Sequence, residues 1–262
     1  MKRILLSTLP VLAATIFYAQ VAMGTGLSQV DTAGGTVPTI TYTGANCVGS
    51  ASAVTASCTL AAIAPAGDLL VITSKTAAPS SNDAKAVLTF SGAASCKDAT
   101  QVIAPGNAVW QTNGRGHFMP VTFVCIITTA GATTPVVTWL GTGVNGSFTD
   151  ISVASYHTTT SWKRNFVDQT ATHVATTSTT DCPTGTTATT TNPHDLVIAI
   201  CDNFNAGETW GALSGFTNRT ASSRNTTGWY DTTVSSPGAQ SATIPLSDDD
   251  YGIGIIMAFA SN

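Results

Sequence analysis

Apolar runs separated by turn-forming residues fill most of this chain. Residues 69–74 (LLVITS) and 196–200 (LVIAI) are continuous apolar runs of the length of a strand that is buried on both faces. Residues 36–43 (TVPTITYT) alternate between polar and apolar, which predicts a half-buried strand. Such runs return at intervals of roughly 8–15 residues, so the pattern indicates an all-β antiparallel sandwich or barrel. No segment has the length and periodicity of an amphipathic helix.

The turn chemistry between the runs predicts four hairpins. Asn-Gly pairs, which supply the positive φ angles of tight β-turns, occur at Asn113-Gly114 and Asn145-Gly146. Pro237-Gly238 and the run Asp248 to Asp250 mark the other two reversals. We therefore expect consecutive strands to pair across these four turns.

A turn, an Asp and an apolar run occur twice, in residues 65–75 (PAGDLLVITSK) and 192–202 (NPHDLVIAICD). Asp68 and Asp195 hold matching positions in the two segments. A pair of catalytic or metal-binding carboxylates is one interpretation. We favour another, in which each Asp accepts backbone N–H bonds at the entrance of a buried strand, so that the chain forms two related halves of one sandwich domain.

Several short motifs between residues 60 and 260 resemble those of a group of secreted bacterial jelly-roll β-sandwich proteins. They are AGDLLVI, TTTNPHDLVIAI, GFTNR, SSPG and the terminal MAFAS. The resemblance implies an antiparallel jelly-roll β-sandwich. Most of that group has no assigned activity and offers no catalytic residue to carry over. The six cysteines and the Thr-rich stretch lie outside the pattern of the group.

The N-terminus has the features of a secretory signal peptide. Lys2 and Arg3 precede an apolar stretch over residues 4–19, and small residues follow near Gly24. The alternative is an uncleaved anchor, although the stretch is short for a bilayer core of about 30 Å. We expect a signal peptide over 1–24, an extended segment over 25–44 and a β-sandwich domain over 45–262. No later segment is long and apolar enough to span a membrane, so the protein is expected to be secreted, extracellular or at the cell surface.

Cysteine spacing supports the same compartment. An even number of cysteines behind a signal peptide indicates disulfides formed in an oxidising environment. Their clustering favours neighbouring partners, and zinc-type C-x₂₋₄-C spacing is missing. The expected pairs are Cys47–Cys58, Cys96–Cys125 and Cys182–Cys201.

Charged residues make up only 9% of the chain, against roughly 25% in an average soluble protein, and the formal net charge is −4. No basic patch is present, which argues against nucleic-acid binding. Carbohydrate-binding sandwiches stack sugars on exposed aromatic rings beside polar groups, and the aromatics in or near loops are the best candidates for this role here, although we favour structural packing for each of these tryptophans. The candidate ligand-binding residues are Trp210, Trp229, Tyr230, Asp202 and Glu208.

Other chemistry has weaker support. Asp202 and Glu208 could form the carboxylate pair of a glycoside hydrolase, although a solvated loop explains them as well. Asp248, Asp249 and Asp250 could bind Ca²⁺, or they could only solubilise a hairpin tip. No zinc-hydrolase motif and no G-x-S-x-G nucleophile elbow occurs, so we expect no enzyme.

The sequence thus predicts a secreted, non-catalytic protein that binds a surface glycan or polysaccharide, or that acts in adhesion. Two alternatives stay open, namely a structural subunit of an extracellular filament or surface layer, and a hydrolase with an unrecognised site. If the protein self-assembles, residues 25–43 could add a strand to the open sheet edge of a neighbour. The competing expectation is that this segment pairs within its own sandwich.

Overall fold

A computed structural model describes the chain from residue 37 to residue 262, with gaps. The predicted signal peptide and most of the extended segment 25–44 lie outside the described residues. The described ranges are 37–43, 47–51, 53–61, 63–78, 84–92, 95–103, 109–111, 116–141, 144, 148–203, 207–220 and 226–262.

Every regular element among the described residues is a strand, which confirms the predicted all-β class. The abundance of β-branched Thr, Val and Ile agrees with this, because such side chains fit a pleated sheet. The strands are β1 (Ile40–Tyr42), β2 (Cys47–Ala51), β3 (Thr55–Ser57), β4 (Leu69–Ala78), β5 (Lys85–Gly92), β6 (Ser95–Ile103), β7 (Val109–Gln111), β8 (Gly116–Thr129), β9 (Thr133–Leu140), β10 (Thr149–Thr158), β11 (Trp162–Val174), β12 (Thr179–Thr186), β13 (Leu196–Asp202), β14 (Thr217–Asn218), β15 (Thr227–Thr233), β16 (Ser241–Asp250) and β17 (Ile253–Ser261).

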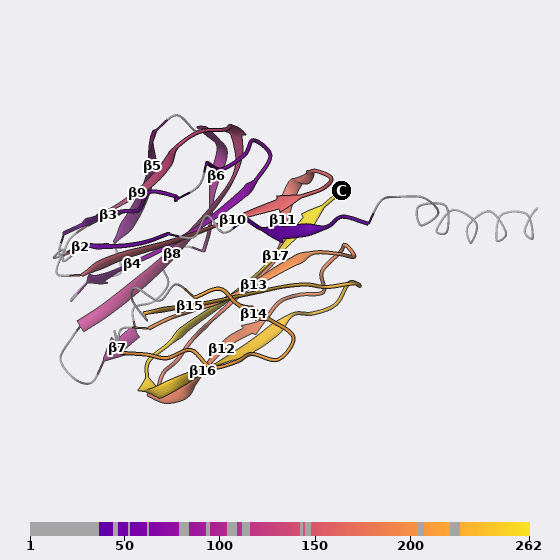
Figure 1. The fold of residues 1–262 in the computed structure, drawn as a ribbon. Helices are drawn as coiled ribbons and strands as arrows, with labels where there is room; N and C mark the ends of the chain where they lie inside the picture. Colours follow the sequence, from indigo (N-terminus) through magenta and orange to yellow (C-terminus); the bar gives the residue numbers. More distant parts are fainter. Residues whose placement is uncertain are drawn as a thin grey trace, which may run out of the picture. The chain divides into compact units, whose positions relative to one another are not determined.

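Two halves of the chain repeat one strand order (Figure 1). In the first half the large sheet runs β1-β10-β4-β8-β6, with β2 also on β10 and β7 also on β8. In the second half the order is β11-β17-β13-β15-β14. A smaller sheet completes each half, β3-β9-β5 in the first and β12-β16 in the second. All pairings are antiparallel, and a jelly-roll order is not evident in them.

The repeated turn-Asp-strand segment occupies equivalent positions in the two halves. The two predicted buried runs are β4 and β13, which are the central strands of the two large sheets. The residue before each Asp is left-handed, with φ +92° at Gly67 and φ +65° at His194. Glycine adopts that region without strain, whereas a histidine there is uncommon.

The structure differs from the predicted topology in two details. The described residues form four sheets, a large and a small one in each half, where two related halves of one sandwich were expected. Of the four predicted hairpins, only β7–β8 pairs across its turn. The other three turns carry the chain from one sheet to another, between β9 and β10, β15 and β16, and β16 and β17. Turn residues specify a reversal of direction, but they do not specify which sheet receives the next strand.

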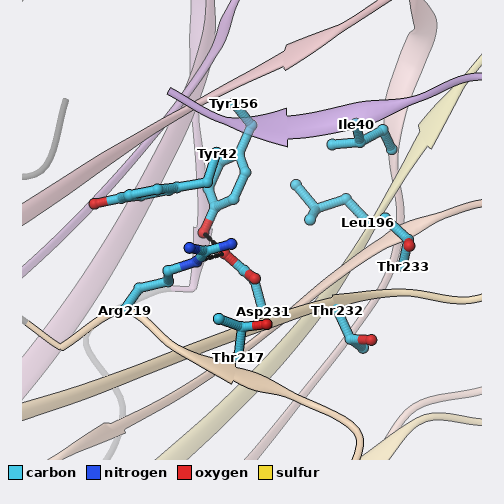
Figure 2. A pocket seen from close by; sticks show the side chains of 9 residues that line it. All are labelled: Ile40, Tyr42, Tyr156, Leu196, Thr217, Arg219, Asp231, Thr232 and Thr233. Carbon is cyan, nitrogen blue, oxygen red and sulfur yellow. Dashed lines mark hydrogen bonds and ion pairs between the residues drawn. The ribbon is translucent and has the colours of Figure 1, made fainter. Parts of the chain in front are cut away.

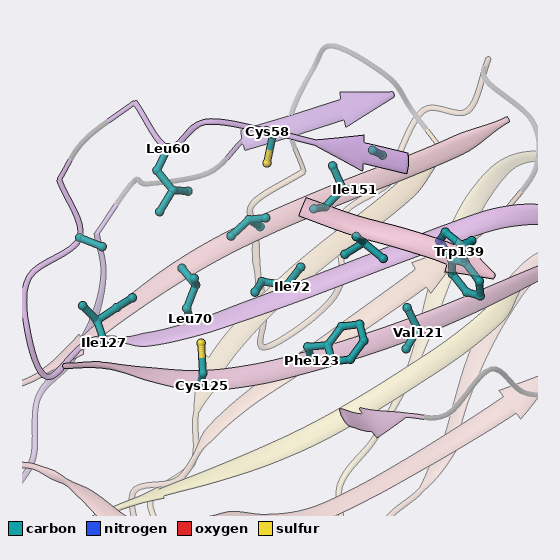
Figure 3. Packing of buried hydrophobic residues seen from close by; sticks show 14 of the residues in the cluster. Cys58, Leu60, Leu70, Ile72, Val121, Phe123, Cys125, Ile127, Trp139 and Ile151 are labelled. Atoms are coloured by element: carbon teal, nitrogen blue, oxygen red, sulfur yellow. The ribbon is translucent and has the colours of Figure 1, made fainter. Parts of the chain in front are cut away.

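Three apolar clusters hold the sheets together. The first lies between the two sheets of the first half and contains Ile72 and Phe123 of the large sheet and Trp139 of the small one (Figure 3). The third lies between the two sheets of the second half. The second cluster joins the halves, since residues of β4, β8 and β10 pack there against residues of β13, β15 and β17. The central strands are therefore apolar on both faces, as their continuous runs predict.

Disulfides Cys96–Cys125 and Cys182–Cys201 confirm two of the three predicted pairs. Cys58 is also disulfide-bonded, and the side chain of its predicted partner Cys47 lies outside the described residues. These bonds indicate an oxidising, extracellular type of environment. Within the described ranges, no helix has the length and apolar character needed to cross a membrane.

The N-terminal strand β1 pairs within its own chain. Ile40, Thr41 and Tyr42 lie opposite Thr158, His157 and Tyr156 of β10. For these three residues the internal-strand expectation is therefore confirmed. The strand is shorter than the predicted run 36–43, and it brings a tyrosine to the region where the two halves meet.

Candidate functional site

A pocket of about 210 Å³ opens beside β1, and side chains from both halves line it (Figure 2). β1 and β10 contribute Tyr42 and Tyr156 from the first half. The remaining polar lining comes from β14, β15 and the residue that follows β14. The lining residues are Ile40, Tyr42, Tyr156, Leu196, Thr217, Arg219, Asp231, Thr232 and Thr233.

The carboxylate of Asp231 accepts two hydrogen bonds in this pocket. Its Oδ2 accepts a bond of 2.9 Å from Arg219 Nε and a bond of 3.1 Å from the Tyr156 hydroxyl. The indole Nε1 of Trp229 donates in turn to Tyr156 Oη at 2.9 Å. Burial and the Asp231 carboxylate raise the pKa of Tyr156 well above its usual value, so the phenol stays protonated and acts as a donor.

Arg219 is the more exposed of the two charged groups that line the pocket. Its side chain is 31% exposed, against 7% for Asp231. The guanidinium carbon lies 4.6 Å from the centre of the Tyr42 ring, a cation–π distance. Tyr42 packs edge-on against Tyr156, with ring centroids 5.6 Å apart. The arrangement presents a positioned cation, an aromatic ring and several hydroxyls at the surface, which suits recognition of a small polar ligand.

The predicted aromatic ligands are placed differently. Trp229 and Tyr230 lie in strand β15 and are buried, which agrees with structural packing and not with rings exposed for stacking on a sugar. Trp210 does lie in a loop, where its ring packs directly on the backbone of Gly228. Alternation along β15 sends Trp229 and Tyr230 to opposite faces of the sheet, where each joins a different apolar cluster.

Asp202 and Glu208 are buried side chains with separate partners, so the solvated-loop interpretation is wrong for both. Asp202 Oδ1 lies 3.4 Å from the ammonium of Lys75. Glu208 Oε2 accepts bonds from the backbone N–H and the hydroxyl of Ser247, at 2.9 Å each. Glu208 thereby attaches the loop in which it lies to strand β16.

The run of three aspartates lies at the end of β16, so the prediction that it forms a hairpin tip is wrong. Asp248 and Asp249 are exposed, whereas Asp250 is buried and accepts a bond from the N–H of Tyr251. Successive side chains of a strand point to opposite faces, so three neighbours do not converge on one ion. Among the residues that the structure describes, no group of three His, Cys, Asp or Glu is placed to hold a metal ion.

The carboxylate of Asp68 accepts bonds from side chains, and its predicted role as a turn acceptor is wrong. Ser155 Oγ donates to Oδ2 at 3.0 Å, and His157 Nδ1 lies 2.8 Å from Oδ1. These three residue types form hydrolase triads, in which the histidine takes the proton of the serine. Here the serine hydroxyl is bonded to the aspartate instead, so the order of a triad is not reproduced.

The partner of Asp195 is the carboxyl group of Asp168, whereas acceptance of backbone N–H bonds was predicted. Its two oxygens are buried and accept no hydrogen bond. Burial and the neighbouring Asp168 raise the pKa of Asp195 to about 7. Burial would also raise the pKa of Asp168, but two bonds from Thr191 outweigh it, so that pKa is lowered. A protonated Asp195 that donates to an ionised Asp168 accounts for both shifts.

The free energy of unfolding should therefore fall as the pH rises toward neutral. A carboxyl whose pKa is raised by folding stabilises the native state fully below its unfolded pKa, and this contribution is lost as the pH passes through about 7. We expect Asp195→Asn to be more stable than the wild type at pH ~8 and similar to it at pH ~4, because an amide keeps a donor without a charge.

Urea unfolding at several pH values measures this difference, with Asp181→Asn as the control on an exposed aspartate. A wild type and an Asp195→Asn variant with parallel pH profiles would contradict the pairing of Asp195 with Asp168.

Sequence reasoning missed the residues that form the pocket. Tyr42 was expected only as a strand residue, Tyr156 carried no motif, and Arg219 entered only through the resemblance. One signal was present: a chain with 9% charged residues places few ionic groups, so each Arg or Asp within an apolar pattern has a specific partner.

Comparison with known proteins identifies no relative. No family model, no curated protein and no solved structure matches the chain.

Proposed function

We propose that this is an extracellular, non-catalytic binding protein that holds one sugar unit of a surface glycan or polysaccharide in the Arg219 pocket. The observation that supports this proposal best is the cation held between Asp231 and the Tyr42 ring at the mouth of the pocket. Sugars bind through hydrogen bonds to fixed polar groups and through contact of their C–H faces with aromatic rings.

The size and polarity of the pocket favour this ligand class over an apolar one. Its volume of about 210 Å³ is below the roughly 300–1,000 Å³ of sites for drug-sized molecules. Threonine hydroxyls at Thr217, Thr232 and Thr233 add donors and acceptors around the rim. One ring at the end or side of a longer chain matches these dimensions, which suits attachment to a cell surface or polysaccharide.

The resemblance to secreted jelly-roll proteins supports an extracellular role for this protein. That group is secreted, and the disulfides of this chain agree with an extracellular environment.

Arg219→Met should weaken glycan binding by at least tenfold, because the variant removes the hydrogen-bonding cation but keeps an apolar stem. Titration calorimetry of glycans selected on an array measures the effect. Arg164→Met, on an exposed arginine of β11, is the matched control and should bind as the wild type does.

Thermal unfolding of the Arg219→Met protein separates a binding defect from a folding defect. The proposal fails if the wild type binds no glycan on a broad array, or if the Arg219→Met and Arg164→Met proteins bind equally well.

A further inference from the structure

A buried lysine joins the two halves of the molecule. Lys75 lies in β4, and its side chain is 2% exposed. Its ammonium group donates to Asp202 Oδ1 at 3.4 Å, to Thr227 Oγ1 at 3.0 Å and to the carbonyl oxygen of Thr226. Lysine is seldom buried so completely, because an ammonium in an apolar interior loses its hydration.

Two buried carboxylates accompany this ammonium. Asp202, at the end of β13, is 1% exposed, and Asp150, in β10, is 2% exposed. Asp150 lies directly opposite Lys75 in the antiparallel pairing of β10 with β4, so the two side chains share one face of the sheet. Asp150 Oδ2 also accepts a bond of 2.6 Å from Thr226 Oγ1. The ammonium of Lys75 therefore lies 3.4 Å from an oxygen of one buried carboxylate, and a second buried carboxylate shares its face of the sheet.

We propose that Lys75 and Asp202 condense to an amide, which makes this cluster a site of intramolecular cross-linking. Asp150 accepts one proton from the ammonium, and the neutral amine attacks the Asp202 carboxyl carbon. The new C–N bond replaces one C–O bond. The displaced oxygen leaves as water with two protons from the nitrogen, one of them returned by Asp150. No oxidant and no cofactor is required.

The energetics of burial favour the product. The cluster before reaction holds an ion pair with a large desolvation penalty. The reaction removes the charges of Lys75 and Asp202 as one neutral amide and one water molecule, and the Asp150 carboxylate keeps its bond from Thr226 Oγ1. The surrounding groups already match an amide. Thr73 Oγ1 lies 3.3 Å from Asp202 Oδ2 and can donate to the amide oxygen. The Thr226 carbonyl and the Thr227 hydroxyl can accept from the amide N–H.

The cross-link would fasten the two halves to each other. Lys75 and Asp202 are 127 residues apart and lie in the central strands of the two large sheets. The two disulfides whose partners the structure describes, by contrast, lie within single halves. A bond between β4 and β13 keeps the halves together when the chain is pulled, and unlike a disulfide it survives reduction.

Peptide mapping of an aged preparation of the folded, full-length protein tests the proposal. After reduction and digestion, we expect one branched species that contains the Lys75 and Asp202 peptides and lacks one water molecule. Asp150→Asn keeps the shape of the proton acceptor but removes its basicity, so this variant should yield the two peptides separately or form the branch far more slowly.

Asp248→Asn, on an exposed aspartate, is the matched control and should cross-link as the wild type does. Separate, unmodified Lys75 and Asp202 peptides from the wild type would overturn the proposal. A branch from Lys75 to Asp150 would overturn the assignment of Asp202, and full cross-linking of Asp150→Asn would overturn the role of Asp150.

Discussion

A chain with Lys75→Met is expected to unfold with a free energy about 3–5 kcal/mol below that of the wild type, because removing one partner of a buried ion pair leaves the other charge unpaired. Methionine keeps most of the length of the lysine side chain, so little volume is lost. The carboxylates of Asp202 and Asp150 would then lie in the interior without the ammonium. The loss is expected for the ion pair and for the amide alike, since either form neutralises Asp202.

Two further variants make this result specific. Lys85→Met changes an exposed lysine of β5 and should alter the free energy of unfolding by no more than about 0.5 kcal/mol. Adding Asp202→Leu to Lys75→Met should recover part of the loss, since an apolar replacement of a buried pair is often neutral. Chemical denaturation measures all three. A loss below about 1 kcal/mol for Lys75→Met would show that the cluster is hydrated or rearranged.

Phe259→Ala is expected to cost about 3–5 kcal/mol and to destabilise both halves of the molecule. Phe259 lies in β17, is fully buried and stacks on Phe166, with ring centroids 6.5 Å apart. Its cluster contains Leu69 and Val71 of the first half together with Leu196 and Ile198 of the second. A cavity there weakens the packing of one half on the other as well as the packing within β11–β17.

Native-state hydrogen exchange distinguishes the two effects, because it reports the opening free energy of each strand separately. Amides of β4 and β13 should lose similar protection in the Phe259→Ala protein. Phe216→Ala is the control. Phe216 is partly buried against the third apolar cluster, between the two sheets of the second half, so this variant should leave β4 unaffected. Loss of protection confined to β11–β17 would show that the halves open independently.

The candidate site depended on contacts that no local pattern encodes. Tyr42, Tyr156, Arg219 and Asp231 come from four separate stretches of the chain and meet only because β1 closes on β10 while β15 packs across from it. The burial of Trp229 could not be predicted, for the corresponding reason. Trp229 is in a strand next to turn residues, and an exposed loop aromatic and a buried strand aromatic look alike in such a sequence.

The sequence by itself determined the secondary structure class, the buried central strands β4 and β13, the repeat of a turn-Asp-strand segment and two disulfides. Each of these follows from local chemistry, namely β-branched composition, unbroken apolar runs, turn residues and neighbouring cysteines. Only the tertiary structure decided which sheet each strand joins and which charged groups share the interior. Lys75 and Asp202 lie 127 positions apart, and their contact depends on the packing of whole sheets. Sheet packing is set by the sum of many side chains on both faces, so it has no signature at any single position.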